Sequence, residues 1–128
     1  MRLTTLALGA GLLTLAAGPL AAQSMNAEVY HQRASALMKK GPMALFSRGE
    51  IKALMEEGQK AGLKSREQRL AAVKAGGKPR SCPPEGKQSM SPDEFMKRLS
   101  AIPLAERQRI DMTEAMTRIS AAKFPCPA

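Results

Sequence analysis

Two cysteines have the clearest chemical role in this chain. Cys82 lies between Ser81 and Pro83, and Cys126 lies between two prolines. The pair lacks the Cys-x-x-Cys spacing of redox-active dithiols, whereas two cysteines in one small domain of an oxidising compartment are typically joined. We therefore predict a structural Cys82–Cys126 disulfide. It would close a loop of about 45 residues and stabilise the fold by about 4 kcal/mol through chain entropy.

The other reactive side chains form no recognisable catalytic or metal-binding pattern. His31 is the single histidine, and we expect it on the surface or partly packed. Asp93 and Glu94, like Glu56 and Glu57, are adjacent on expected helices and therefore point to different faces, which is unsuitable for an acid/base pair. We predict that the protein is not an enzyme and has no metal site and no cofactor.

The methionines suggest one more chemistry, copper(I) binding through thioethers. Met112 and Met116 are one helical turn apart, and His31 would complete such a site. Both methionines, however, share a helical stripe with Ala115 and Ile119. The sequence therefore favours packing in the core over metal binding.

The first 24 residues have the pattern of a cleavable export signal. Arg2 provides the positive end, and residues 3–20 are apolar and uncharged. Small residues then allow cleavage after Ala22 or after Ser24, and the sequence leaves both open. An uncleaved membrane anchor is the competing interpretation, because about 20 apolar residues can span a bilayer. We predict removal of the signal and a periplasmic location.

Residues 25–128 are expected to form a single all-α domain of four to five helices braced by the disulfide. The chain has one Tyr, three Phe and no Trp, but nine Met, and the alternating β-branched and aromatic pattern of strands is nearly absent. Residues 76–90 contain several glycines and prolines without a helical period, so we predict a loop there.

Four helix starts are predicted from local signals. Asn26 would cap a first helix that ends before Gly41. Ser47 would open a second through a capping box with Glu50. This second segment, residues 48–75, is either one helix or two joined near Gly62.

The C-terminal helices have similar signals. Ser91 would cap the third helix, followed by a proline in its first turn. Pro103 would end that helix and begin the fourth, which carries apolar residues through Ala122. The apolar positions expected to face the core are Val29, Tyr30, Ala34, Leu37, Met38, Ile51, Leu54, Met55, Leu63, Leu70, Val73, Phe95, Met96, Leu99, Ile102, Leu104, Met112, Ala115, Met116, Ile119 and Ala122.

The charge distribution indicates a binding surface. The chain carries 20 basic and 11 acidic residues, a formal net charge of +9. Basic residues concentrate in the second helical segment, where the candidate surface is Lys60, Lys64, Arg66 and Arg69. Such a surface suits an acidic protein groove or an anionic envelope surface. Export and the lack of aromatic residues in the basic run argue against nucleic acid.

The C-terminal half resembles a known family. Residues 82–86 fit a C-x-P-x-G opening, a capped helix and a break at Pro103 follow, and the half ends with Phe124-Pro125-Cys126. This succession resembles the type VI secretion amidase immunity proteins, the periplasmic Tai-type family. The resemblance covers residues 82–126, whereas the N-terminal half diverges and has no cysteine in residues 29–81.

The resemblance implies a small, helical, disulfide-bonded periplasmic protein that blocks a peptidoglycan amidase toxin by steric plugging. We therefore expect a non-catalytic protein-binding domain whose partner is a periplasmic peptidoglycan amidase. The alternative is a basic, envelope-associated structural protein that binds anionic lipid or cell-wall polymer. A homodimer is compatible with either function.

Overall fold

The computed structural model describes residues 24–128. Its elements are α1 (Ala27–Lys39), the 3-10 segment η1 (Gly41–Ser47), α2 (Arg48–Lys74), α3 (Pro92–Ala101), α4 (Leu104–Arg107) and α5 (Met112–Lys123). Within these residues no strand is present beyond an isolated bridge between Asn26 and Asp111. The prediction of an all-α domain is confirmed. The predicted signal peptide lies almost wholly outside the described residues.

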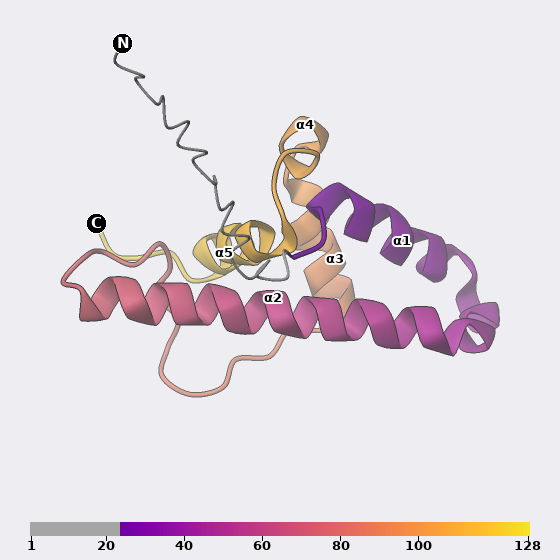
Figure 1. Cartoon of the computed structure of the whole chain (residues 1–128), viewed down its shortest axis with the longest axis horizontal. Helices are drawn as coiled ribbons and strands as arrows, with labels where there is room; N and C mark the ends of the chain where they lie inside the picture. The colour runs from indigo at the N-terminus through magenta and orange to yellow at the C-terminus, as the bar shows by residue number, and fades with distance from the viewer. Residues whose placement is uncertain (1–23) are drawn as a thin grey trace, which may run out of the picture.

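Helix α2 is the longest element, with 27 residues, and runs along one edge of the molecule with α1 and α5 on the same side of it (Figure 1). It continues through both of its interior glycines as one helix. A Cβ atom on Gly58 would lie 3.2 Å from the Tyr30 hydroxyl oxygen, and one on Gly62 would lie 3.5 Å from the Met116 methyl carbon. These glycines therefore allow α1 and α5 to approach closely, at a cost of about 1 kcal/mol each in helix propensity.

Two of the predicted N-caps are confirmed. The Asn26 side chain accepts hydrogen bonds from the amides of Glu28 and Val29 at 2.9 and 3.2 Å. Ser91 Oγ accepts from the Glu94 amide at 3.2 Å. Side-chain caps of this kind satisfy N–H groups that have no partner within the helix.

The predicted capping box at Ser47 is wrong. Ser47 Oγ accepts a hydrogen bond from Lys40 Nζ at 3.0 Å instead, and both carboxylate oxygens of Glu50 bond the Arg33 guanidinium at 2.6 Å. The physical reason is that η1 leads directly into α2, so Ser47 does not have the extended backbone of a capping residue (φ −107°, ψ 40°).

The prediction of a single helix after Pro103 is also wrong, because two helices, α4 and α5, occupy this region. Helix α4 ends at Arg107, and α5 starts at its own cap, where Asp111 Oδ1 accepts from the Glu114 amide at 2.8 Å. Asp111 has an extended backbone that interrupts the helical path. The Asp-x-x-Glu spacing at 111–114 was the sequence signal for this start.

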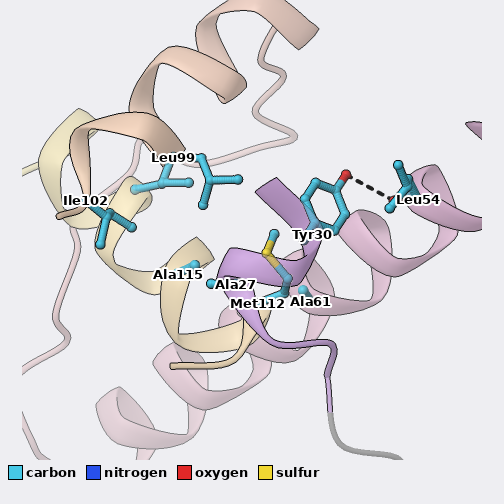
Figure 2. Packing of buried hydrophobic residues seen from close by; sticks show 9 residues of the cluster. Ala27, Tyr30, Leu54, Ala61, Leu99, Ile102, Met112 and Ala115 are labelled. Carbon is cyan, nitrogen blue, oxygen red and sulfur yellow. Dashed lines mark hydrogen bonds between the residues drawn. The ribbon is translucent and has the colours of Figure 1, made fainter. Parts of the chain in front are cut away.

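The core lies where α1, α2, α3 and α5 meet (Figure 2). Its buried hydrophobic residues are Ala27, Tyr30, Leu54, Ala61, Leu99, Ile102, Met112, Ala115 and Ile119. The Tyr30 hydroxyl donates to the Leu54 carbonyl at 3.1 Å, and its ring packs edge-on against Phe95 with centroids 5.8 Å apart. Ser65 of α2 and Thr117 of α5 are hydrogen-bonded at 2.8 Å.

The core prediction is correct for α3, for most of α5 and for Tyr30, Ala34 and Leu37 of α1, but it is wrong for most of α2. Phe95 and Met96 pack against the buried residues of the core. Eight expected core residues are instead exposed: Val29, Met38, Met55, Leu63, Leu70, Val73, Leu104 and Ala122. The cause is that α1 and α5 contact only the face of α2 that carries Leu54, Ala61 and Ser65.

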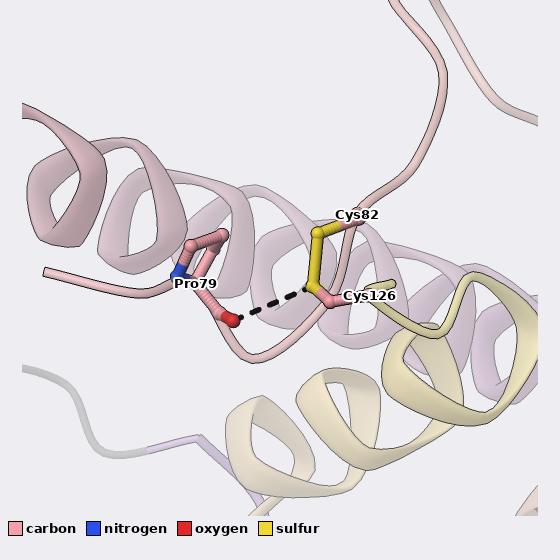
Figure 3. The surroundings of a disulfide bond; sticks show 3 residues. All are labelled: Pro79, Cys82 and Cys126. Carbon is pink, nitrogen blue, oxygen red and sulfur yellow. Dashed lines mark hydrogen bonds between the residues drawn. A yellow bond between two sulfur atoms is a disulfide. The ribbon is translucent and has the colours of Figure 1, made fainter. Parts of the chain in front are cut away.

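The predicted disulfide joins Cys82 and Cys126, with an S–S distance of 2.06 Å and Cα atoms 4.8 Å apart (Figure 3). Next to it, the Cys82 amide donates to the Phe124 carbonyl at 2.8 Å. The Cys126 sulfur also lies 3.5 Å from the Pro79 carbonyl oxygen, a contact without a donated proton because the sulfur is bonded. The loop after α2 is thereby tied to the end of the chain.

Candidate functional site

The four basic residues singled out in the sequence lie on α2 but do not form one compact patch. Lys60 and Lys64 are one turn apart and share one side of the helix, whereas Arg66 and Arg69 occupy another. Lys60 and Arg66 are exposed, and Lys64 and Arg69 are half-buried. Within residues 24–128 none of the four takes part in an ion pair. No carboxylate of the described residues therefore neutralises their charge.

Between these basic residues lies an apolar strip that the sequence interpretation had assigned to the core. We call it the α2 outer stripe: Met55, Leu63, Leu70 and Val73, with 52 to 60% of each residue exposed. Leu63 and Leu70 are about two turns apart and Met55 and Val73 about five, so the four lie on two neighbouring lines along one side of the helix. Scattered exposed hydrophobic residues are normal, but an aligned row on one helix face indicates an interaction surface.

A second apolar surface lies at the bend between α1 and α2. We call it the η1 corner: Met43, Leu45 and Phe46, with exposed fractions of 62, 65 and 84%. The bend is opened by Gly41, whose φ of 55° is in the left-handed region that favours glycine. Leu45 also lines a hollow of about 400 Å³ together with Ile51 and Met55 of α2. The η1 corner is therefore adjacent to the start of the α2 outer stripe.

The α1–α2 bend is held by polar contacts. The bidentate pair between Arg33 and Glu50 joins α1 to the first turn of α2. This pair lowers the pKa of Glu50, chiefly through the hydrogen bond from Arg33. Lys40 reaches across the bend to Ser47. The exposed apolar side chains are thus presented on a braced turn.

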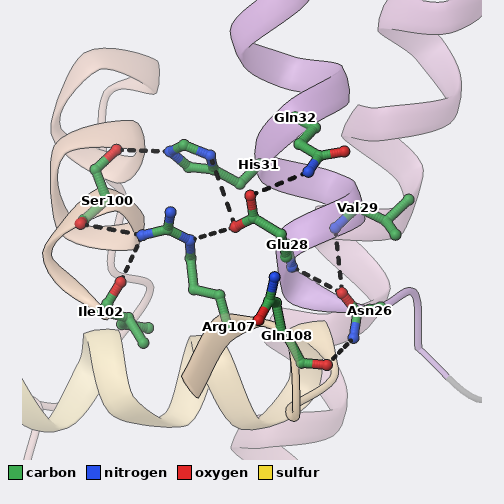
Figure 4. Close-up of polar contacts among 9 residues, drawn as sticks. All are labelled: Asn26, Glu28, Val29, His31, Gln32, Ser100, Ile102, Arg107 and Gln108. Atoms are coloured by element: carbon green, nitrogen blue, oxygen red, sulfur yellow. Dashed lines mark hydrogen bonds and ion pairs between the residues drawn. The ribbon is translucent and has the colours of Figure 1, made fainter. Parts of the chain in front are cut away.

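A buried ion pair joins α1 to α4 (Figure 4). Arg107 Nε donates to Glu28 Oε2 at 2.6 Å, and each residue is only 8% exposed. Arg107 also donates to the carbonyl oxygens of Ile102 and Ser100, at 2.5 and 3.2 Å. The hydrogen bond from Arg107 is the main cause of the lowered pKa of Glu28. Nothing in the sequence pattern marked this pair, whose members are 79 positions apart.

In the same cluster a histidine lies between a serine and a carboxylate in space. His31 Nε2 lies 2.9 Å from Ser100 Oγ, and His31 Nδ1 lies 4.0 Å from Glu28 Oε2. Burial is the main cause of the lowered pKa of His31, followed by the charge of Arg107. The order resembles a hydrolytic triad, and the sequence interpretation had not brought these residues together.

Two features of the geometry favour a structural role for this succession. The distance of 4.0 Å is too long for a hydrogen bond that would orient the imidazole, and Glu28 is already bonded to Arg107. Ser100 lies in the last turn of α3, where backbone amides are used within the helix instead of facing a developing oxyanion. The contacts join α1, α3 and α4.

The remaining sequence hypotheses concern metals and membranes. Met112 is fully buried and Met116 packs against the core, as predicted from their stripe. In the part of the chain that the structure describes, no three or more His, Cys, Asp or Glu residues are grouped to hold a metal ion. Among the helices of residues 24–128, none combines the length and apolar character needed to span a bilayer.

Comparison of the chain with protein-family models, with curated proteins and with solved structures gave no match.

Proposed function

We propose that residues 25–128 form an exported, non-catalytic protein-binding domain that blocks a periplasmic peptidoglycan amidase by steric plugging. The observation that carries the proposal is the η1 corner, a bend with a largely exposed phenylalanine that follows the exposed Met43 and Leu45. Aromatic residues dominate the binding energy of many protein interfaces when a partner pocket covers them. The corner is the part of the domain that would enter the amidase cleft.

The surroundings of the corner support such a role. A plug must keep its shape in order to exclude substrate without losing much conformational entropy on binding. Arg33 and Glu50 brace the bend from α1 to α2, and Tyr30 anchors α1 to α2 through its hydrogen bond to the Leu54 carbonyl. The hollow beside Leu45 would also accept a side chain of the partner.

The choice of an amidase as partner comes from the C-terminal half. Residues 82–126 resemble the type VI secretion amidase immunity proteins in their motifs and spacing. The Cys82–Cys126 disulfide gives this half a fixed connection to the loop after α2. The divergent N-terminal half, which includes the η1 corner, would then determine which amidase is bound.

The experiment is a binding and inhibition assay with the oxidised domain, residues 25–128, and purified periplasmic peptidoglycan amidases. We expect a stable complex that blocks hydrolysis of purified sacculi. Phe46→Ala should weaken binding by about 30-fold, corresponding to an interface hot spot of about 2 kcal/mol. Leu104→Ala, which truncates an exposed leucine of α4, is the matched control and should bind like the wild type.

Two results would count against the proposal. One is a periplasmic pulldown with the wild-type domain that recovers no cell-wall hydrolase. The other is an amidase complex that Phe46→Ala and Leu104→Ala weaken equally, which would place the interface away from the η1 corner.

A further inference from the structure

We infer that the outer face of α2 is a docking surface for an anionic lipid bilayer. The α2 outer stripe supplies apolar side chains, and basic residues on its two sides supply positive charge. This inference does not depend on the amidase proposal, because it needs no protein partner and its surface shares only Met55 with the hollow beside the η1 corner.

The apolar part of this surface is not used by the fold. The face of α2 that packs on α1 and α5 carries Leu54, Ala61 and Ser65, which are buried. Leu63 and Leu70 lie seven residues apart on the other side, and both remain more than half exposed. A 27-residue helix is about 40 Å long. The outer stripe is thus a long, convex strip that a flat surface can cover more completely than a narrow pocket can.

The charges fit an anionic surface. Lys60 and Lys64 flank one side of the outer stripe, Arg69 flanks the other, and Arg66 lies between Leu63 and Leu70 along it. Long basic side chains can lie along apolar surface while their charged ends reach phosphate groups. Each basic residue near an anionic membrane surface adds about 1 kcal/mol of attraction. The combination of an apolar strip and basic flanks is typical of helices that lie in the membrane interface.

Charge also distinguishes the bilayer from a second copy of the chain. A parallel pairing of two outer stripes would bring Lys60, Lys64, Arg66 and Arg69 of each copy together, and the whole chain has a formal net charge of +9. Like charges in an interface are unfavourable by several kcal/mol. An anionic bilayer supplies the opposite charge together with an apolar layer for the leucines.

The test uses the purified, oxidised domain and sedimentation with vesicles of phosphatidylglycerol and phosphatidylcholine. We expect binding that rises with the phosphatidylglycerol fraction and falls with salt, because exposed charges are screened. Lys60→Gln with Lys64→Gln should weaken partitioning by about 30-fold, the equivalent of two charges. The control is Lys97→Gln with Arg109→Gln, two exposed basic residues outside α2, which should weaken it by less than about 3-fold.

A second pair of variants tests the apolar contribution. Leu63→Gln with Leu70→Gln should abolish most binding even at low salt, while Leu104→Gln should retain it. Circular dichroism and the thermal midpoint verify that each variant is folded. The inference is overturned if the lysine variants behave like their control, or if the leucine variants bind vesicles like the wild type. It is also overturned if light scattering shows a dimer at assay concentrations that the leucine variants dissociate, since a second copy would then cover α2.

Discussion

Helices α5 and α2 both carry apolar residues at helical spacing, but they use them differently. In α5, Met112, Ala115 and Ile119 are almost completely buried. In α2, Leu54 and Ala61 are buried, whereas Leu63 and Leu70 lie on the opposite side and are exposed. Helix α5 thus directs one apolar face to the core, and α2 has one face for the core and one that no described residue covers. Apolar periodicity alone does not separate a face required for folding from a face available for binding.

The largest expected change in stability comes from removing the disulfide, which ties the loop after α2 to the segment that follows α5. Replacing Cys82 and Cys126 together by Ser should lower the free energy of unfolding by about 4 kcal/mol, because the unfolded chain loses a closed loop of about 45 residues. Urea denaturation of the oxidised wild type and of the double variant measures this change in the free energy of unfolding. Reduced wild type is the control and should behave like the variant. Equal stability of oxidised wild type and variant would show that the bond does not brace the fold.

The second comparison truncates one apolar side chain in each helix. Ile119→Ala should lower the free energy of unfolding by about 3 kcal/mol, because it leaves a cavity in a buried site. Leu63→Ala on the α2 outer stripe should change it by no more than about 0.5 kcal/mol. Chemical denaturation of both variants provides the measurement. A large loss from Leu63→Ala would mean that the outer stripe contributes to the fold after all.

The third prediction concerns the buried pair that joins α1 to α4. Arg107→Met should cost about 3 kcal/mol, because it leaves the Glu28 carboxylate buried without its partner. Adding Glu28→Leu should restore part of that loss, since two apolar residues need no partner in a buried site. Denaturation of the two single variants and the double variant gives the coupling energy. A double variant as unstable as the sum of the single ones would rule out direct coupling.

The smallest expected effect concerns the pH dependence of the stability of the fold. Arg107 lowers the pKa of Glu28 below the ordinary value of 4.5, so the folded state favours the charged carboxylate. The resulting stabilisation is complete above pH 4.5 and is lost as the pH falls through the lowered pKa. Thermal midpoints measured from pH 7 to pH 3 should therefore fall less steeply for Glu28→Gln than for the wild type. Glu67→Gln, at an exposed position of α2, should keep the wild-type slope.

Several parts of the fold could be predicted because their causes are local. The cap at Ser91 depends on residues within one turn, and the α1 cap at Asn26 is equally local. The disulfide needed only the number of cysteines and the expected compartment. By contrast, Ser47 failed as a cap because its backbone is determined by the preceding 3-10 segment. Local composition does not reveal that continuation.

The core face of α2 could not be chosen from periodicity, because apolar residues occur on two sides of this helix. Gly58 and Gly62 were the available signal, since both mark the side on which other helices approach closely. The basic residues of the candidate surface were found from the sequence, but their division into two flanks requires the helix geometry. The pair of Glu28 with Arg107 was missed because it joins distant parts of the chain.

The contact between the starts of α1 and α5 has a consequence for the order of folding. The Ala27 amide donates to the Ile110 carbonyl at 2.9 Å, and the Met112 amide donates to the Met25 carbonyl at 2.7 Å. Contacts between such distant positions form slowly, because a long loop must close before they contribute. The N-terminal end of the core is therefore completed only when the last fifth of the chain has emerged. A polypeptide arranged in this way remains incompletely folded for most of its synthesis, a state compatible with the export that we propose.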